Sequence, residues 1–159
     1  MESLERQESM PVSLENASEA DIQELIDTEK SVSGPHTYSP TLDESEWKEE
    51  LKKNSVYLIK VAGRTVGNFS YEQKSPEHLY ISGIVVSPEF QGRGIAKTVL
   101  TQFLNQHKEV MRIDLVTHPD NPALKLYQSL GFEVESRQEN YWGEGEPRLV
   151  LVLSKEKHL

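Results

Sequence analysis

The sequence of 159 residues contains no cysteine. Disulfide bonds, thiolate zinc sites and a cysteine nucleophile are therefore excluded. Histidines are few, and the five that are present show no H-E-x-x-H spacing. Without thiolates or suitably spaced histidines, the sequence predicts no metal requirement.

Long apolar runs and an excess of basic charge are also missing. No stretch is long enough to span a bilayer, and residues 1–7 lack the basic and apolar regions of a signal peptide. We therefore expect a cytoplasmic protein with no membrane partner. Lys and Arg number 17 against 26 Asp and Glu, which gives a formal net charge of -9. This acidity argues against a nucleic-acid partner and fits a cationic or amine-bearing one.

The pattern of apolar residues predicts one compact α/β domain over residues 11–155, preceded by a polar, disordered tail at 1–10. A capping box at 18–21 begins a first helix, which a loop at 33–40 ends. Strands are predicted at 12–16, 55–61, 65–73, 78–86, 113–117, 132–137 and 149–153, and further helices at 43–53, 93–107 and 122–130. Gly131 should cap the last helix, and the helix at 93–107 should bury Ala96, Val99, Leu100 and Phe103.

Between Val85 and Ala96 a loop with two glycines joins a strand to a helix. Gly92 and Gly94 allow backbone conformations closed to other residues and let an anion approach the main chain. The helix that follows offers its unpaired N–H groups and the positive end of its dipole to the same anion. The loop therefore predicts a phosphate site, although neither G-x-x-x-x-G-K-[ST] nor G-x-G-x-x-G is present.

The segment Gln91-Gly92-Arg93-Gly94-Ile95-Ala96 resembles the Gln/Arg-x-x-Gly-x-Gly/Ala motif of the GCN5-related N-acetyltransferase (GNAT) family. Residues 122–132 resemble the later family motif, a short helix that carries a tyrosine and ends in Leu-Gly-Phe. Together the likeness covers roughly Val12 to Leu153. It implies the acyl-CoA N-acyltransferase fold of that family, a mixed α/β (α+β) structure with a central, mostly antiparallel sheet of about seven strands and helices on both faces.

The resemblance implies acetyl-CoA as the co-substrate. Main-chain amides of the loop would bind the pyrophosphate, and the edge of strand Ile84-Val85-Val86 would bind the pantetheine arm. The implied binding residues are Ile84, Val85, Val86, Gln91, Gly92, Arg93, Gly94, Ile95, Ala96, Asn121 and Tyr127. By strict spacing, Asp120 occupies the position at which the family has an asparagine. Asn121 can instead serve as the N-cap of the helix that begins at Pro122.

Tyr127 is the catalytic candidate, because it occupies the position of the motif tyrosine that often protonates the departing thiolate in the family. An unperturbed pKa near ~10 keeps this hydroxyl protonated at neutral pH. Packing on the apolar stripe of its own helix is the alternative role. Since no thiol nucleophile is present, the acetyl group should pass directly to the acceptor or through a different nucleophile, and direct transfer is our prediction.

The motifs do not identify the general base. Tyr80 holds the position of the glutamate of histone-type members, and Leu115 or Val116 holds that of the glutamate of ribosomal-protein N-terminal acetyltransferases. Glu72, Tyr80 and His118 remain candidates, of which only His118 titrates near neutral pH unaided. A chain of water molecules that leads to bulk solvent is an equal alternative.

The acceptor is predicted only as an amine. Residues 139–147 resemble the tyrosine-rich hairpin of protein N-terminal acetyltransferases and slightly favour a peptide N-terminus. Their aromatic and acidic side chains equally fit a polyamine, an aminoglycoside-like amine or an amino acid. His36, Tyr38 and Trp47 are further candidate contacts, and packing in the loop or at the surface is the alternative role of each, which we favour. A non-catalytic acyl-CoA-binding module is the alternative function, and we expect a monomer or a homodimer.

Overall fold

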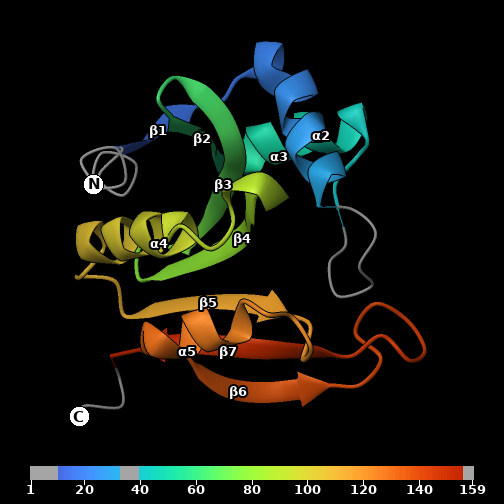
Figure 1. The fold of residues 1–159 in the computed structure, drawn as a ribbon. Helices are drawn as coiled ribbons and strands as arrows, with labels where there is room; N and C mark the ends of the chain where they lie inside the picture. Colours follow the sequence, from blue (N-terminus) through green and yellow to red (C-terminus); the bar gives the residue numbers. More distant parts are fainter. Residues whose placement is uncertain (1–10, 33–39, 156–159) are drawn as a thin grey trace.

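The computed structural model describes residues 11–32 and 40–155, and within them one sheet of seven strands runs in the order β1-β2-β3-β4-β5-β7-β6 (Figure 1). Neighbouring strands are antiparallel except β4 and β5, which are parallel. The strands are β1 (Val12–Asn16), β2 (Ser55–Val61), β3 (Arg64–Ser75), β4 (His78–Val86), β5 (Arg112–Thr117), β6 (Glu133–Gln138) and β7 (Arg148–Ser154). The helices are α2 (Ile22–Ser31), α3 (Glu44–Lys53), α4 (Ile95–Gln106) and α5 (Leu124–Ser129), with short 3-10 turns η1 (Glu19–Asp21) and η2 (Pro88–Phe90). The predicted fold is confirmed, whereas the predicted tail at 1–10 lies outside the described residues.

Helices cover both faces of the sheet because side chains alternate along each strand. On β2, Val56 and Leu58 face one side, where they pack with α2 and with Trp47 of α3. Ile59 and Val61 face the opposite side, where they pack in the core beneath α4. The sheet therefore lies between two separate apolar layers.

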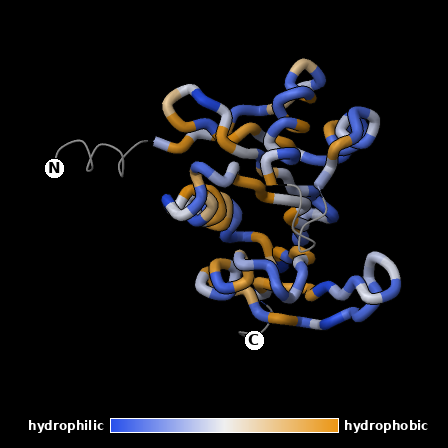
Figure 2. Tube along the Cα trace, turned by 45° about the vertical axis from the view of Figure 1, so that its right-hand side comes forward, coloured by the Kyte–Doolittle hydropathy of each residue, from blue (hydrophilic) through white to orange (hydrophobic). Residues whose placement is uncertain are grey.

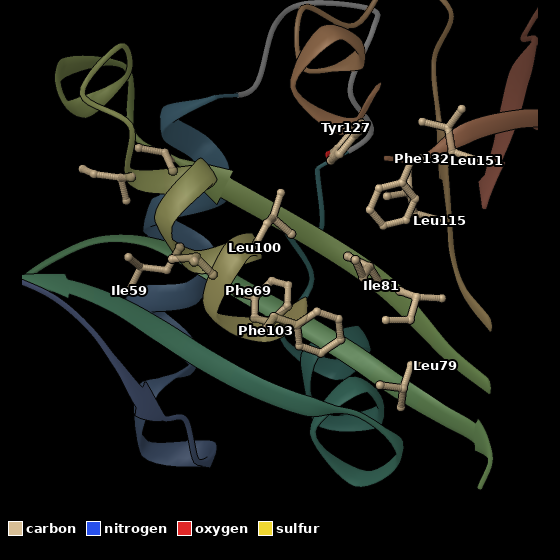
Figure 3. Packing of buried hydrophobic residues seen from close by; sticks show 14 of the residues in the cluster. Ile59, Phe69, Leu79, Ile81, Leu100, Phe103, Leu115, Tyr127, Phe132 and Leu151 are labelled. Carbon is tan, nitrogen blue, oxygen red and sulfur yellow. The ribbon is translucent and has the colours of Figure 1, made fainter. Parts of the chain in front are cut away.

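The larger core lies between the sheet and helices α4 and α5 (Figure 3). Phe69 of β3 meets Phe103 of α4 edge to face, with their ring centroids 5.2 Å apart. Farther along the sheet, Tyr127 of α5 lies near Phe132 and Leu151. Hydrophilic residues predominate in the peripheral turns (Figure 2). Helices α4 and α5 thus pack on the same face of the sheet.

Two predicted boundaries at α4 are wrong by a residue or two. The helix begins at Ile95 rather than at 93, because Gly92 and Gly94 have φ angles of 79° and 77°, which lie outside the helical region. Ala96 is only partly buried, and Ile95 takes its expected place in the core. The remaining members of the predicted stripe, at 99, 100 and 103, are buried.

The start and end of α5 also differ from the prediction. The Asn121 side-chain oxygen accepts a hydrogen bond from the Ala123 backbone N–H at 2.8 Å, which closes a turn before the helix. Ala123 is therefore the N-cap, not Asn121. Leu130 is the C-cap, and Gly131, with a φ of 105°, follows it.

Strands β4 and β5 separate along their length. They pair only where residues 78–81 of β4 face residues 112–115 of β5. Just beyond, Ser82 is an extra residue against β3, because Ser70 pairs with Gly83 while Tyr71 pairs with Ile81. A β-bulge of this kind bends its strand and increases the local twist. The last residues of β4 consequently leave β5 and open a space between the two strands.

Candidate active site

A pocket of about 450 Å³ occupies the space between the diverging strands. Its volume lies in the usual range for small-molecule sites, about 300–1,000 Å³. The wall consists of residues from β4, from the end of β5 and from α5 with the turn before it, together with single residues from other elements. These residues are Val32, Tyr80, Ile81, Ser82, Gly83, Ile84, Val85, Val86, Gln91, Ala96, Leu115, Val116, Thr117, His118, Asn121, Pro122, Ala123, Leu126, Tyr127, Trp142 and Arg148.

Most of the residues predicted to bind acetyl-CoA come together at this pocket. Those that line it are Ile84, Val85, Val86, Gln91, Ala96, Asn121 and Tyr127. The other four, Gly92, Arg93, Gly94 and Ile95, are not part of the wall. Ile95 belongs to the core, and the Arg93 guanidinium lies over the Phe90 ring at 5.0 Å. The two ends of the glycine loop, Gln91 and Ala96, thus line the pocket, and the four residues between them do not.

The glycine loop has the features of an anion site at the start of a twelve-residue helix. The Gln91 side-chain amide donates to the Val86 carbonyl at 2.9 Å and so ties the loop to the end of β4. A Cβ atom added to Gly92 or Gly94 would meet nothing within 4 Å in the described structure. The first turn of α4 contains no acidic residue that would compete with an anion for the helix N-terminus. No atom of the described structure thus fills the space beside these two glycines.

Tyr127 both packs in the core and lines the pocket. Its side chain is 7% exposed, and its ring meets Phe132 edge to face at 6.2 Å. Burial raises the pKa of Tyr127 to about 12, because the phenolate form loses hydration. The hydroxyl therefore carries its proton at neutral pH, as a proton donor requires.

The three side chains considered as general bases are poorly suited to that role. Burial raises the pKa of Tyr80 to about 12, with nearby Tyr141 and Asp114 adding to the shift, so this phenol stays protonated. Glu72 forms an ion pair with Lys74 at 3.3 Å and is not part of the pocket wall. Of the three general-base candidates, only Tyr80 and His118 line the pocket.

His118 is buried in the wall and is held by its own loop. Its Nδ1 atom accepts a hydrogen bond from the Asp120 backbone N–H at 3.0 Å. In the neutral ring this geometry assigns the proton to Nε2, so that nitrogen donates rather than accepts. His118 is therefore arranged as a hydrogen-bond donor, and water remains the alternative that fits as the base.

The candidate acceptor contacts divide into two groups. Trp142 lines the pocket with 62% of its surface exposed, and Tyr141 meets it edge to face at 5.1 Å. Trp47, in contrast, is buried between α2 and α3, and its indole N–H donates to the Thr41 carbonyl at 2.9 Å. Its predicted role as a substrate contact is wrong, because it is a core residue. His36 and Tyr38 lie outside the described residues.

Sequence reasoning missed three polar residues of the wall, Ser82, Thr117 and Arg148. The Thr117 hydroxyl is buried and has no hydrogen-bond partner within residues 11–32 and 40–155. An unpaired buried hydroxyl costs free energy unless a ligand or water satisfies it. A polar residue at the end of an apolar strand was the only signal in the sequence.

The substitution Thr117→Val should weaken acetyl-CoA binding without destabilising the protein. Valine has nearly the shape of threonine and removes a hydroxyl that the described protein leaves unpaired. We expect the dissociation constant to rise roughly threefold to tenfold, the usual value of one hydrogen bond. Calorimetric titration with acetyl-CoA measures this change.

Thr28→Val is the matched control. The Thr28 hydroxyl is buried but donates to the Leu25 carbonyl and accepts from the Asn68 amide, both at 2.7 Å. This control should lower the thermal stability and leave the affinity unchanged. Unchanged affinity in a destabilised Thr117→Val protein would instead give Thr117 a purely structural role.

No helix among the described residues is long and apolar enough to cross a bilayer. No group of three or more His, Asp or Glu side chains in that part of the chain is arranged to hold a metal ion.

The glycine loop and most of the pocket wall lie in a segment that matches a single protein family. Residues 20–132 match the acetyltransferase (GNAT) family, and the chain belongs to that family. The resemblance that the two sequence motifs suggested is thereby confirmed.

Known proteins agree with this assignment. The uncharacterized N-acetyltransferase YafP of Escherichia coli is 30% identical over 97 residues, which span 61% of this chain and 58% of YafP. The L-amino acid N-acetyltransferase AaaT of E. coli is 28% identical over 122 residues, which span 67% of this chain and 75% of AaaT. The crystal structure of the E. coli ribosomal-protein-S18-alanine N-acetyltransferase has the same fold, with a TM-score of 0.77 at 17% identity over 91% of this chain and 94% of that one.

Proposed function

We propose that the protein transfers the acetyl group of acetyl-CoA directly to a primary amine. The observation that carries this proposal is the pocket between β4 and β5, with Tyr127 in its wall and the Gln91–Ala96 loop beside it. The residues present fit acetyl-CoA. The loop and the first turn of α4 supply N–H groups for the pyrophosphate. Residues 82–86 of β4, which do not pair with β5, supply backbone groups for the pantetheine arm.

The chemistry follows from the groups at the pocket. The amine nitrogen attacks the thioester carbonyl carbon, a C–N bond forms, and the C–S bond breaks. Tyr127 then donates its proton to the departing thiolate and recovers one from solvent, while the amine loses its proton to water. Direct transfer is consistent with the absence of cysteine. The donor role is consistent with the high pKa of Tyr127, about 12.

The acceptor class has two candidates within the proposal. The fold shared with a ribosomal-protein-S18-alanine N-acetyltransferase supports a peptide or protein N-terminus. The sequence similarity to an L-amino acid N-acetyltransferase supports a small amine. A module that binds acyl-CoA without chemistry is the alternative, and the unidentified general base is the observation that favours it. We further propose that the protein acts in the cytoplasm as a monomer or homodimer.

A panel of amines tests the activity. The purified protein is incubated with acetyl-CoA and with amino acids, peptides, polyamines and aminoglycosides in turn, and free CoA is detected. We expect CoA release that depends on an amine and is unchanged by EDTA. Binding of acetyl-CoA without release in the presence of any amine would favour the binding module, and activity lost to EDTA and restored by zinc would overturn the metal-free mechanism.

A further inference from the structure

We propose that Glu50 of α3 receives the proton that the acceptor amine loses during acetyl transfer, and that this proton travels through the Ser82 hydroxyl and one water molecule. The inference rests on the proposed acetyltransferase function and names the group to which water passes the proton. Ser82 lines the pocket, whereas Glu50 is connected to it through the side chain of Asn54.

The side-chain amide of Asn54 links Ser82 to Glu50. Its Nδ2 atom donates to the Ser82 Oγ atom at 3.0 Å and also to a carboxylate oxygen of Glu50. Because both oxygens bind the same nitrogen, they lie no more than two hydrogen-bond lengths apart, about 6 Å. One water molecule that bonds to both oxygens spans such a gap.

The other polar atom of Asn54 indicates water at this place. Its Oδ1 atom is buried and has no hydrogen-bond partner within residues 11–32 and 40–155. A buried amide oxygen costs free energy unless a donor satisfies it, and bound water commonly does so. We therefore expect ordered water around the Asn54 side chain, between α3 and β4.

The Ser82 hydroxyl has the hydrogen-bonding capacity that the transfer needs, because a hydroxyl accepts two hydrogen bonds and donates one. Its oxygen can accept from Asn54 and from the acceptor amine, and its O–H can donate to the water that reaches Glu50. As the C–N bond forms and the C–S bond breaks, the nitrogen proton passes to Ser82 Oγ, the Ser82 proton to water and a water proton to Glu50. Glu50 is partly exposed and then releases the proton to solvent.

These groups approach the pocket from the face of the sheet opposite Tyr127. Asn54 is the C-cap of α3, which packs with α2 on one face, whereas Tyr127 belongs to the core on the other. The attacking nitrogen and the departing sulfur are separate substituents of the reacting carbon, so groups on two sides can serve them. Glu50 thus takes a proton from the nitrogen while Tyr127 supplies one to the sulfur.

The surroundings of Glu50 raise the pKa of its carboxyl group above the ordinary value. Burial is the largest cause, because it removes water from the carboxylate. Glu72 on β3 and Glu46 on the same helix add to the rise, whereas Lys53 and the hydrogen bond that the carboxylate accepts oppose it. The phenol of Tyr80 on β4 also lies nearby. A raised pKa makes the carboxylate a stronger base.

The pH dependence of kcat/KM tests the inference. The acceptor is the most active member of the amine panel, which includes leucine, spermidine and trialanine, and acetyl-CoA is saturating. A base acts as its carboxylate, so its contribution is lost as the pH falls through its pKa. We expect the wild-type kcat/KM to fall at low pH with two protonations, that of the amine and that of Glu50. Glu50→Gln should lower kcat/KM at least ~10-fold at neutral pH, leave the KM for acetyl-CoA unchanged and retain only the protonation of the amine.

Carbon-13 NMR of the glutamate carboxyl groups gives a readout that does not depend on turnover. The Glu50 signal is the one that Glu50→Gln lacks. Its titration in the protein with bound CoA should give the same pKa as the lower protonation step in the wild-type kcat/KM. Two different values would overturn the assignment of that step to Glu50.

Two further positions test the path and provide the control. Ser82→Ala should also lower kcat/KM at least ~10-fold, because it removes the hydroxyl that passes the proton on, and Ser82→Thr should recover most of the activity. Glu49→Gln is the matched control, since Glu49 is the exposed neighbour of Glu50 on α3, pairs with Lys52 at 3.4 Å and is not part of the pocket wall. This control should leave the kinetics and their pH dependence unchanged.

The outcomes keep the inference apart from the proposed function. Wild-type activity and an unchanged fall at low pH in Glu50→Gln would overturn the inference and leave the acetyltransferase function standing. If the wild-type protein acetylates no amine, both fail together. Should Glu50→Gln not fold, wild-type activity in Ser82→Ala would still overturn the inference, and a loss in Ser82→Ala that Ser82→Thr restores would support it.

Discussion

Replacing Tyr127 by phenylalanine should reduce kcat at least ~10-fold while acetyl-CoA binding stays nearly unchanged, since general acid catalysis contributes typically ~10²–10⁴-fold. Phenylalanine keeps the ring that packs against Phe132 and removes only the hydroxyl.

The pKa of Tyr127, raised to about 12, also predicts how kcat depends on pH. An acid acts in its protonated form, so its contribution is lost only as the pH rises through that value. The wild-type kcat should therefore show no loss from Tyr127 between pH 6 and 9, a window well below the pKa of about 12.

Tyr71→Phe is the control for this experiment. Tyr71 also packs in the larger core, against Phe103 at 4.9 Å, but it does not line the pocket. Its variant should keep the wild-type kcat. Steady-state kinetics and calorimetric titration with acetyl-CoA are measured on both proteins. A kcat within about twofold of wild type in Tyr127→Phe would assign this tyrosine to packing and leave thiolate departure unassisted by it.

The sequence predicts the elements and the co-substrate side of the pocket because those features are local. Gly92 and Gly94 require positive φ angles, and their place between a strand and a helix specifies an anion site without knowledge of the fold. The alternation of side chains along β2 specifies two apolar faces. Helices α2 and α3 cover one of them, and α4 covers the other. These signals depend on a few neighbouring residues. The structure confirms the positive φ angles and the two covered faces, and the anion site stays a prediction.

The polar groups at the end of β5 and at the start of β7 depend on features that are not local. Thr117 and Arg148 reach the wall because β4 leaves β5 after the extra residue Ser82. Gly83, next to Ser82, is compatible with a bulge in this strand but does not show that β4 leaves β5 there. Arg148 begins a strand that is otherwise mostly apolar. Trp47 was predicted as a substrate contact and is instead a core residue. Its burial depends on the packing of α3 against α2, and its charged neighbours in the sequence do not indicate this packing.

The substitution Gly94→Val should raise the dissociation constant of acetyl-CoA at least ~10-fold, since hydrogen bonds to a charged group are each worth about 1.5–3 kcal/mol. A valine side chain at this N-cap position would occupy the space in which a pyrophosphate approaches the first turn of α4. In the described structure the added Cβ meets no atom within 4 Å, so the protein itself accommodates it sterically. The cost to folding comes from the φ angle of 77°, which a β-branched residue rarely adopts.

Gly63→Val separates this backbone strain from the loss of the anion site. Gly63 has the same φ of 77°, and a Cβ there likewise meets nothing within 4 Å in the described part of the chain. It lies in the turn between β2 and β3 and is not part of the pocket wall. Both variants should lose similar thermal stability, whereas only Gly94→Val should lose affinity for acetyl-CoA in calorimetric titration. Equal losses of affinity would attribute the effect to strain, and wild-type affinity in a folded Gly94→Val protein would remove the pyrophosphate from this loop.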